Sequence, residues 1–209
     1  VLMKKRLYPL TMGQKEIAHA AQLYPNSAVN NIGGLVLIED ELDFNLMEKV
    51  IKTVVSRNDG LRLRLVKYQQ WRRILLETLY NLNCKAKHLE INPAVKKFLF
   101  VESLRQKFVD NPSVKVGFVD FTGKTAQEMD DTIAQWNAQP IDVFNSPMYE
   151  FTMIKSWDGR CGVFSKIDHL ATDAWMSTLL WREIVEVYYA MLRGEELPPA
   201  PITYLTVLE

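Results

Sequence analysis

The sequence has little cysteine and little histidine, and each scarcity argues against a class of function. The two cysteines, Cys84 and Cys161, lie far apart and outside any Cys-x-x-Cys pattern. We therefore expect free thiols, as is typical of a cytoplasmic protein, rather than a disulfide framework. The three histidines are scattered along the chain, so no metal site is predicted.

The sequence also lacks an excess of charge of one sign and any long apolar run. Lys plus Arg number 25 and Asp plus Glu number 25, so we expect no nucleic acid partner bound through its phosphates. No apolar run approaches the roughly 20 residues of a membrane helix, so no membrane partner is expected. The 209 residues are 48% hydrophobic, as in a globular domain, and the start at Val1 suggests a piece of a longer protein.

Several helix starts are marked by side chains that can accept hydrogen bonds from the first turn. Thr11 with Gln14 and Thr125 with Glu128 have the spacing of a capping box. Asp43 precedes apolar residues at helical spacing and predicts a further helix.

Apolar runs between these helices predict strands at residues 32–38, 114–121, 149–156 and 160–169. The dipeptide Asp158-Gly159 between the last two runs predicts a hairpin. Helices and strands that alternate along the chain predict an α/β fold class, here an α+β mixed sheet flanked by helices.

The segment Leu61 to Leu65 alternates leucine and arginine, which predicts a strand with Arg62 and Arg64 on one face. Those arginines could be solvated, or they could hold a carboxylate in a cleft. Residues 68–113 show no clear period: 71–80 fits strand or helix, and Asn92-Pro93 predicts a helix that runs to about Asp110.

A corner between a strand and a helix is the candidate functional site. Strand 160–169 ends at His169, Asp173 follows four residues later, and a helix with a clear apolar stripe is predicted from Trp175 to Arg193. Strand alternation places His169 on an inward, mostly apolar face and points Asp168 away from it. A histidine shielded from water could remain neutral and accept a proton, although a boundary histidine is the commoner outcome of such spacing alone.

Four segments, in the same order, resemble the N-terminal lobe of a nonribosomal peptide synthetase condensation domain. They are Tyr8-Pro9-Leu10-Thr11 with Gln14, Arg57 to Arg64, Asp168 to Trp175, and Gly194 to Tyr204. The resemblance covers nearly all of residues 1–209. Residues 68–113 match poorly and could be a divergent insertion, and residues 194–209 would begin the connection between lobes.

The resemblance implies a lobe of the chloramphenicol-acetyltransferase-like fold, one of the two lobes of a condensation domain. Such a domain joins a carrier-bound acyl or peptidyl thioester to a carrier-bound amine, within either a starter or an elongation type of synthetase. It implies upstream and downstream carrier domains, a neighbouring adenylation domain and a missing C-terminal lobe as partners. No cofactor would be bound directly, because phosphopantetheine is carried by the carrier domains.

The resemblance also assigns roles within the motif. His169 would act as a general base or would position the attacking amine, and Asp173 would pair structurally with Arg62. Asp168, Ala174 and Trp175 complete the motif beside the substrate passage. Asp168 replaces the family's first histidine and Ala174 replaces its glycine, whose small size admits substrate close to the backbone. Without its second lobe, the chain is expected to be inactive and to expose apolar surface where that lobe would dock.

Three alternatives remain open from the sequence. A heterocyclisation domain would carry two aspartates, matched by Asp168 and Asp173, but its serine position is Met176 here. A degenerate, non-catalytic domain that recruits partner enzymes would explain the two departures from the motif. A free-standing acyltransferase that uses coenzyme A would share His169 and Asp173 but not the other segments.

Overall fold

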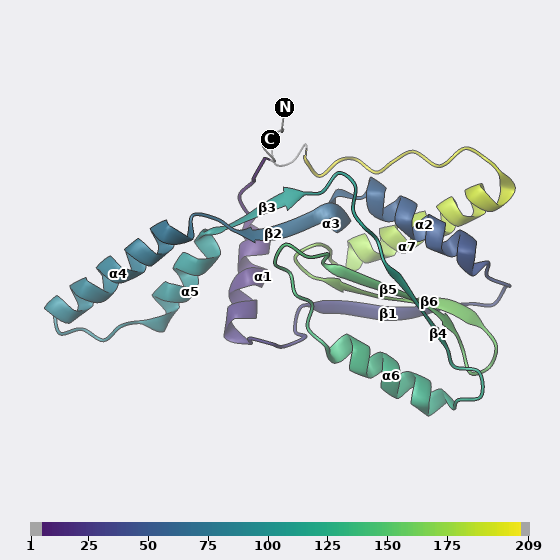
Figure 1. The fold of residues 1–209 in the computed structure, drawn as a ribbon, viewed down its shortest axis with the longest axis horizontal. Helices are drawn as coiled ribbons and strands as arrows, with labels where there is room; N and C mark the ends of the chain where they lie inside the picture. Colours follow the sequence, from purple (N-terminus) through teal and green to yellow (C-terminus); the bar gives the residue numbers. More distant parts are fainter. Residues whose placement is uncertain (1–5, 206–209) are drawn as a thin grey trace.

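A four-stranded mixed sheet forms the centre of the computed structural model, which describes residues 6–205 (Figure 1). The elements in chain order are α1 (Met12–Leu23), β1 (Asn31–Ile38), α2 (Phe44–Arg57), α3 (Asp59–Arg62), β2 (Leu63–Lys67), α4 (Gln70–Ala86), α5 (Pro93–Glu102), β3 (Leu104–Phe108), β4 (Val116–Asp120), α6 (Ala126–Ala138), β5 (Tyr149–Lys155), β6 (Cys161–Asp168) and α7 (Ala174–Arg193). The start at Val1, and residues 206–209 of the expected connection between lobes, lie outside the described residues.

The central sheet has the order β1-β6-β5-β4. Strand β6 is antiparallel to both β1 and β5, whereas β4 is parallel to β5. The hairpin predicted at Asp158-Gly159 is confirmed, and Gly159 adopts a φ of 89°, which favours glycine. The predicted mixed sheet flanked by helices is therefore the observed fold.

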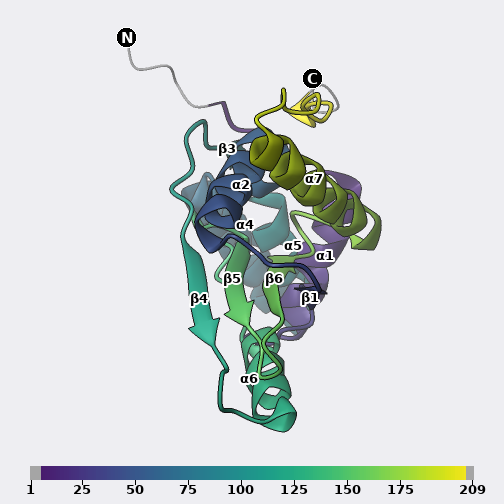
Figure 2. The ribbon, with the colours of Figure 1, turned by 90° about the vertical axis from the view of Figure 1, so that its right-hand side faces the viewer.

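Helices cover both faces of this sheet (Figure 2). Helices α2 and α7 pack on one face, where Val50, Val54 and Val187 are at most 1% exposed. Helix α6 packs on the other face, where Phe164 and Met129 are buried. The alternation of side chains along β5 and β6 supplies both cores, because successive residues point to opposite faces.

The predicted helix starts are confirmed in atomic detail. Thr11 and Thr125 each form a complete capping box, and the side chain of Asp43 accepts a hydrogen bond from the Leu46 N–H. Helix α7 ends at Gly194, which adopts a φ of 66°. The cysteines are free, as expected: Cys84 is buried and Cys161 half-buried.

The prediction of a strand through residues 61–65 is partly wrong. Residues Asp59–Arg62 form the short helix α3, and the strand begins only at Leu63. Leu61 and Leu65 are buried as expected, but Arg62 and Arg64 do not share a strand face. The helical turn at Gly60 and Leu61 interrupts the alternation on which that prediction rests.

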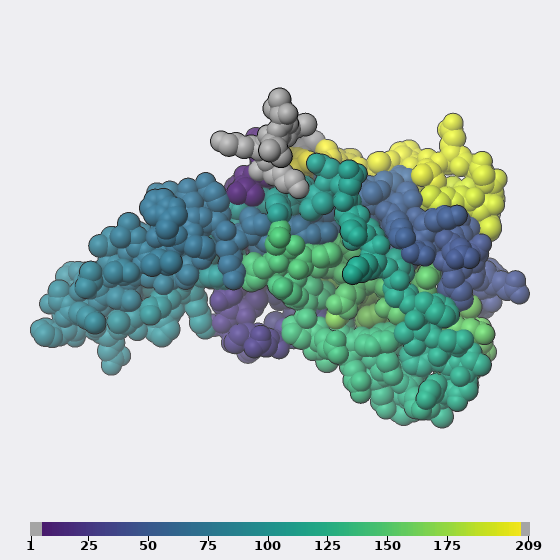
Figure 3. All heavy atoms as spheres, in the orientation of Figure 1, coloured from purple at the N-terminus to yellow at the C-terminus, as the bar shows by residue number. Residues whose placement is uncertain are grey.

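Residues 70–102 form two helices that project from the lobe (Figure 3). The predicted helix after Pro93 ends at Glu102 rather than near Asp110, because β3 follows and pairs antiparallel with β2. The last residue of β2, Lys67, is paired with the first residue of β3, Leu104. A turn of a few residues would be enough to join these two strands, but the chain instead forms α4 and α5 between them. That placement fits an insertion, which remains a prediction.

Among helices of the described chain, none has both the length and the apolar character to span a bilayer.

Candidate functional site

The corner at the end of β6 is fixed by backbone hydrogen bonds on both sides. The Asp168 N–H donates to the Met148 carbonyl at 2.9 Å, and the His169 N–H donates to the Asn30 carbonyl at 2.8 Å. The chain then turns through residues 169–171 and enters α7 at Ala174. His169 is thus held where a strand ends and the longest helix begins.

Asp168 stabilises this turn from its buried side. Its side chain is buried, and its Oδ1 accepts the Leu170 N–H at 2.9 Å. Burial raises the pKa of Asp168 to about 6, against the opposing effects of that hydrogen bond and of nearby His169. The expectation that Asp168 points away from the His169 side chain agrees with their environments, since one is buried and the other exposed.

His169 does not have the water-poor surroundings expected from strand alternation, because its side chain is exposed in this lobe. Its Nδ1 lies 2.9 Å from the Thr172 carbonyl oxygen. A carbonyl oxygen only accepts, so Nδ1 carries the proton of this bond. In the neutral ring, Nε2 is therefore the atom with a free lone pair.

The other motif residues lie along the start of α7. Asp173 is the N-cap, and its Oδ1 accepts the Met176 N–H at 2.7 Å. Ala174 is the first helical residue and is not among the residues with positive φ. Its backbone conformation is therefore one that alanine adopts as readily as glycine. Trp175, the second residue of the helix, is 70% exposed.

The predicted Arg62–Asp173 ion pair is not formed. Arg62 instead makes a short ion pair with Asp59, three residues away on α3. Asp59 also accepts hydrogen bonds from the Thr203 hydroxyl and the Leu205 N–H. Burial opposes its charge, but the bonds from Thr203, Arg62 and Leu205 together hold the pKa of Asp59 below its usual range. Asp59 therefore ties α3 to the C-terminal segment, a role that sequence reasoning missed.

A buried pair of glutamines supports the corner from the opposite side. Gln14 on α1 donates from Nε2 to the Leu170 carbonyl at 3.2 Å and to Gln106 Oε1 at 3.1 Å. Gln106 is fully buried and donates to the Pro9 carbonyl at 2.8 Å. The sequence identifies Gln14 as a capping residue, but nothing in it pairs Gln14 with Gln106, 92 positions away.

A hollow of about 500 Å³ lies directly over this corner. Its walls come from α1, from α3 and β2, from the corner and the start of α7, and from the C-terminal segment. They include Ile17, Leu63, His169, Met176 and Tyr204. Met176 is 46% exposed here, although the stripe of α7 predicts it in the core.

Close packing at the corner requires the glycine of α3. A Cβ added to Gly60 would lie 2.7 Å from the Ala171 carbonyl oxygen, which is too close for any side chain. The sequence signal for this contact is the Asp59-Gly60 pair, which by itself indicates only the end of a helix. Within residues 6–205, no three His, Cys, Asp or Glu side chains are grouped to hold a metal ion.

Comparison with known sequences identifies one family that this chain matches. The family model described as Condensation domain matches residues 97–209. The chain is 20% identical over 208 residues to a component protein of the plipastatin synthase of Bacillus subtilis, covering 99% of this chain and 7% of that protein. It is 25% identical over 205 residues to a component protein of the linear gramicidin synthase of Brevibacillus parabrevis, covering 96% and 3%.

Solved structures agree with the fold. The chain superposes on a variant of the starter condensation domain of rhizomide synthetase with a TM-score of 0.76 at 20% identity, covering 97% of this chain and 42% of that one. The first condensation domain of the calcium-dependent antibiotic synthetase gives a TM-score of 0.72 at 17% identity, covering 94% and 40%. The chain therefore has the fold of somewhat less than half of such a domain.

Proposed function

This chain belongs to the condensation domain family, and from that premise we propose that it is the N-terminal lobe of an amide-forming domain in a nonribosomal peptide synthetase. The substrates would be an acyl or peptidyl thioester and an amine, each delivered on the phosphopantetheine arm of a carrier domain. The observation that carries the proposal is the bond from Nδ1 of His169 to the Thr172 carbonyl. It fixes the tautomer and leaves Nε2 free beside the hollow.

In the proposed reaction, the amine nitrogen attacks the thioester carbonyl carbon, so that a C–N bond forms and the C–S bond breaks. The proton released by nitrogen ends on the departing thiolate. His169 serves this transfer through Nε2, either as the relay of the proton or as the acceptor that orients the amine. Both roles need the same unprotonated nitrogen.

The departures from the family motif are compatible with this role. Asp168 replaces a histidine at a buried position, where its carboxyl group holds the turn through the Leu170 N–H. Ala174 has an ordinary helical backbone and an exposed side chain. Asp173 supports the site by capping α7 and so fixing where the helix begins. These observations favour a catalytic lobe over a purely recruiting one.

The proposal also requires a second lobe. His169 is exposed and the hollow is walled by this lobe alone, so water would compete with the amine and nothing here fixes the thioester from the other side. We propose that a C-terminal lobe, with carrier domains and an adenylation domain, completes the assembly in the cytoplasm. The isolated chain is expected to give no condensation with loaded carriers, and substantial turnover by it would contradict the two-lobe proposal.

The test of the catalytic role uses the full-length synthetase. His169→Ala should lower amide formation by about 100-fold or more, because both a base and a positioned acceptor are lost. His88→Ala is the matched control, since His88 is an exposed histidine of the same lobe and lies outside the hollow. Product is measured by mass spectrometry from loaded carriers. Unchanged product from His169→Ala would overturn the proposal.

A further inference from the structure

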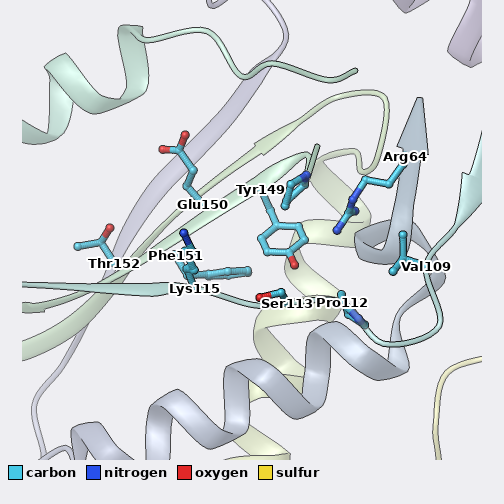
Figure 4. Close-up of a pocket in the computed structure, with 10 residues that line it drawn as sticks. Arg64, Val109, Pro112, Ser113, Lys115, Tyr149, Glu150, Phe151 and Thr152 are labelled. Atoms are coloured by element: carbon cyan, nitrogen blue, oxygen red, sulfur yellow. The ribbon is translucent and has the colours of Figure 1, made fainter. Parts of the chain in front are cut away.

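A second hollow, of about 620 Å³, lies on the other side of β2 from His169. Leu63 lines the hollow over the corner, and the next residue, Arg64, lines this one. Consecutive strand residues point to opposite faces, so the two hollows are separate sites. The walls of the second hollow come from β2, from residues 109–115, and from the start of β5 (Figure 4).

Arg64 is a buried cation without a matching acid. Its side chain is 5% exposed, and no carboxylate of the described chain lies within ion-pair distance of it. Its Nη1 donates to the carbonyls of Leu61 and Leu63 at 3.1 and 2.7 Å. Those bonds engage only Nη1, the rest of the guanidinium lies toward Tyr149, and a buried cation with no carboxylate beside it is costly unless something pairs with it.

A buried hydroxyl group adds an unused donor at the same place. Tyr149 is 5% exposed, and within the described residues no acceptor takes the proton of its hydroxyl group. Arg64 and Tyr149 face one another, with the guanidinium carbon 5.9 Å from the ring centroid (Figure 4). Burial raises the pKa of Tyr149, partly offset by the charge of Arg64 and by hydrogen bonding from its guanidinium group, so the hydroxyl stays protonated at physiological pH and can still donate its own hydrogen.

The remaining walls define what else the occupant carries. Lys115 adds positive charge at the rim, and Glu150, the one acid there, points away from Tyr149 (Figure 4) and is paired with Lys166 at 2.9 Å. Val109 and Phe151 give the hollow an apolar side. Its volume lies within the range of small-molecule sites, which is roughly 300–1,000 Å³.

We propose that this hollow binds a carboxylate attached to an apolar body, with Arg64 and Tyr149 donating hydrogen bonds to the carboxylate oxygens. The apolar body would lie against Val109 and Phe151. The carboxylate could belong to a small acid or to a glutamate on a peptide, because both present the same group to the same donors. The proposal does not depend on the condensation activity proposed above.

The test is titration of this chain with hexanoate, followed by calorimetry or ligand-detected NMR. We expect saturable binding in the millimolar range or tighter. Tyr149→Phe should weaken it about tenfold while leaving the fold intact, because it removes only a hydroxyl group whose proton has no acceptor in the lobe. Arg64→Met should abolish it, and Tyr189→Phe and Arg72→Met are the matched controls at exposed positions.

Further probes establish the chemical class and source of the ligand. Hexylamine should not bind, and inorganic phosphate should bind more weakly than hexanoate. A short, otherwise uncharged peptide with one glutamate is compared with hexanoate, and the tighter of the two identifies the source of the carboxylate. Absence of saturable binding, binding indifferent to Tyr149→Phe, or phosphate binding as tight as that of hexanoate would each overturn the proposal.

Discussion

Helices α7 and α4 both carry rows of large apolar side chains, but the two rows lie in opposite environments. In α7, Leu180 and Val187 are 7% and 0% exposed against the sheet and α2. In α4, Trp71, Leu79 and Leu82 are 65%, 53% and 57% exposed. Helical spacing of apolar residues therefore predicts a helix with an apolar face, but whether that face is covered depends on a partner that the spacing does not name.

The inner face of α4 explains why its apolar row points outward. Toward α5, α4 presents Arg73, whose guanidinium lies 5.7 Å from the Phe100 ring centroid and whose Nη1 bonds Glu77 at 2.7 Å. Cys84 is buried on the same helix. The side of α4 that packs is thus its more polar one, and among the described residues nothing covers the apolar row.

The largest effect expected from this comparison comes from one substitution made in both helices. Leu180→Ala should lower the free energy of unfolding by about 2–5 kcal/mol, because it leaves a cavity in the core between α2, α7 and the sheet. Leu79→Ala is the matched control and should cost less than about 1 kcal/mol, since its side chain is half exposed. Both are measured by urea denaturation. An equal cost at the two positions would show that α4 is covered in solution.

The pH dependence of stability tests whether Asp168, at the corner before α7, is shielded from water. Burial raises the pKa of Asp168 from 3.8 to about 6, so its ionisation opposes folding: its contribution to stability is greatest below pH 4 and is lost as pH rises through 6. Asp168→Asn removes this ionisation and keeps an oxygen that can accept the Leu170 N–H. It should raise stability at pH 7 by up to about 3 kcal/mol and have little effect at pH 4.

The exposed aspartate Asp130 supplies the control for that measurement. Asp130→Asn should change stability by less than about 0.5 kcal/mol at either pH. Chemical denaturation at a series of pH values between 4 and 8 gives both curves. If the Asp168→Asn curve ran parallel to that of the unmodified chain, Asp168 would be solvated rather than buried.

Features of the fold that depend on neighbouring residues were predictable from the sequence. The capping boxes at Thr11 and Thr125 and the turn at Gly159 bring together residues no more than four positions apart. Their geometry is decided by the local chain, so one sequence contains all the information needed.

Features that depend on distant partners were not predictable in the same way. Asp59 bonds Thr203, 144 positions away, and Gln14 bonds Gln106, 92 positions away. The predicted partner of Arg62 was wrong because a nearer acid, Asp59, became available when residues 59–62 formed a helix rather than a strand. His169 and Asp173 were found from their spacing and family resemblance, but shielding of His169 from water would depend on the second lobe that we propose.

The smallest expected effect concerns how the two helices begin. Asp173 caps α7 through its bond to the Met176 N–H, so Asp173→Ala should cost about 1 kcal/mol. Gln69 occupies the same position in α4 but makes no capping bond and has a φ of 47°, so Gln69→Ala should change stability by only a few tenths of a kcal/mol. Both are measured by denaturation at neutral pH. The side-chain bonds of Gln69 to Arg72 and Tyr68 are exposed and contribute little, so equal losses would mean that Asp173 does not cap α7 in solution.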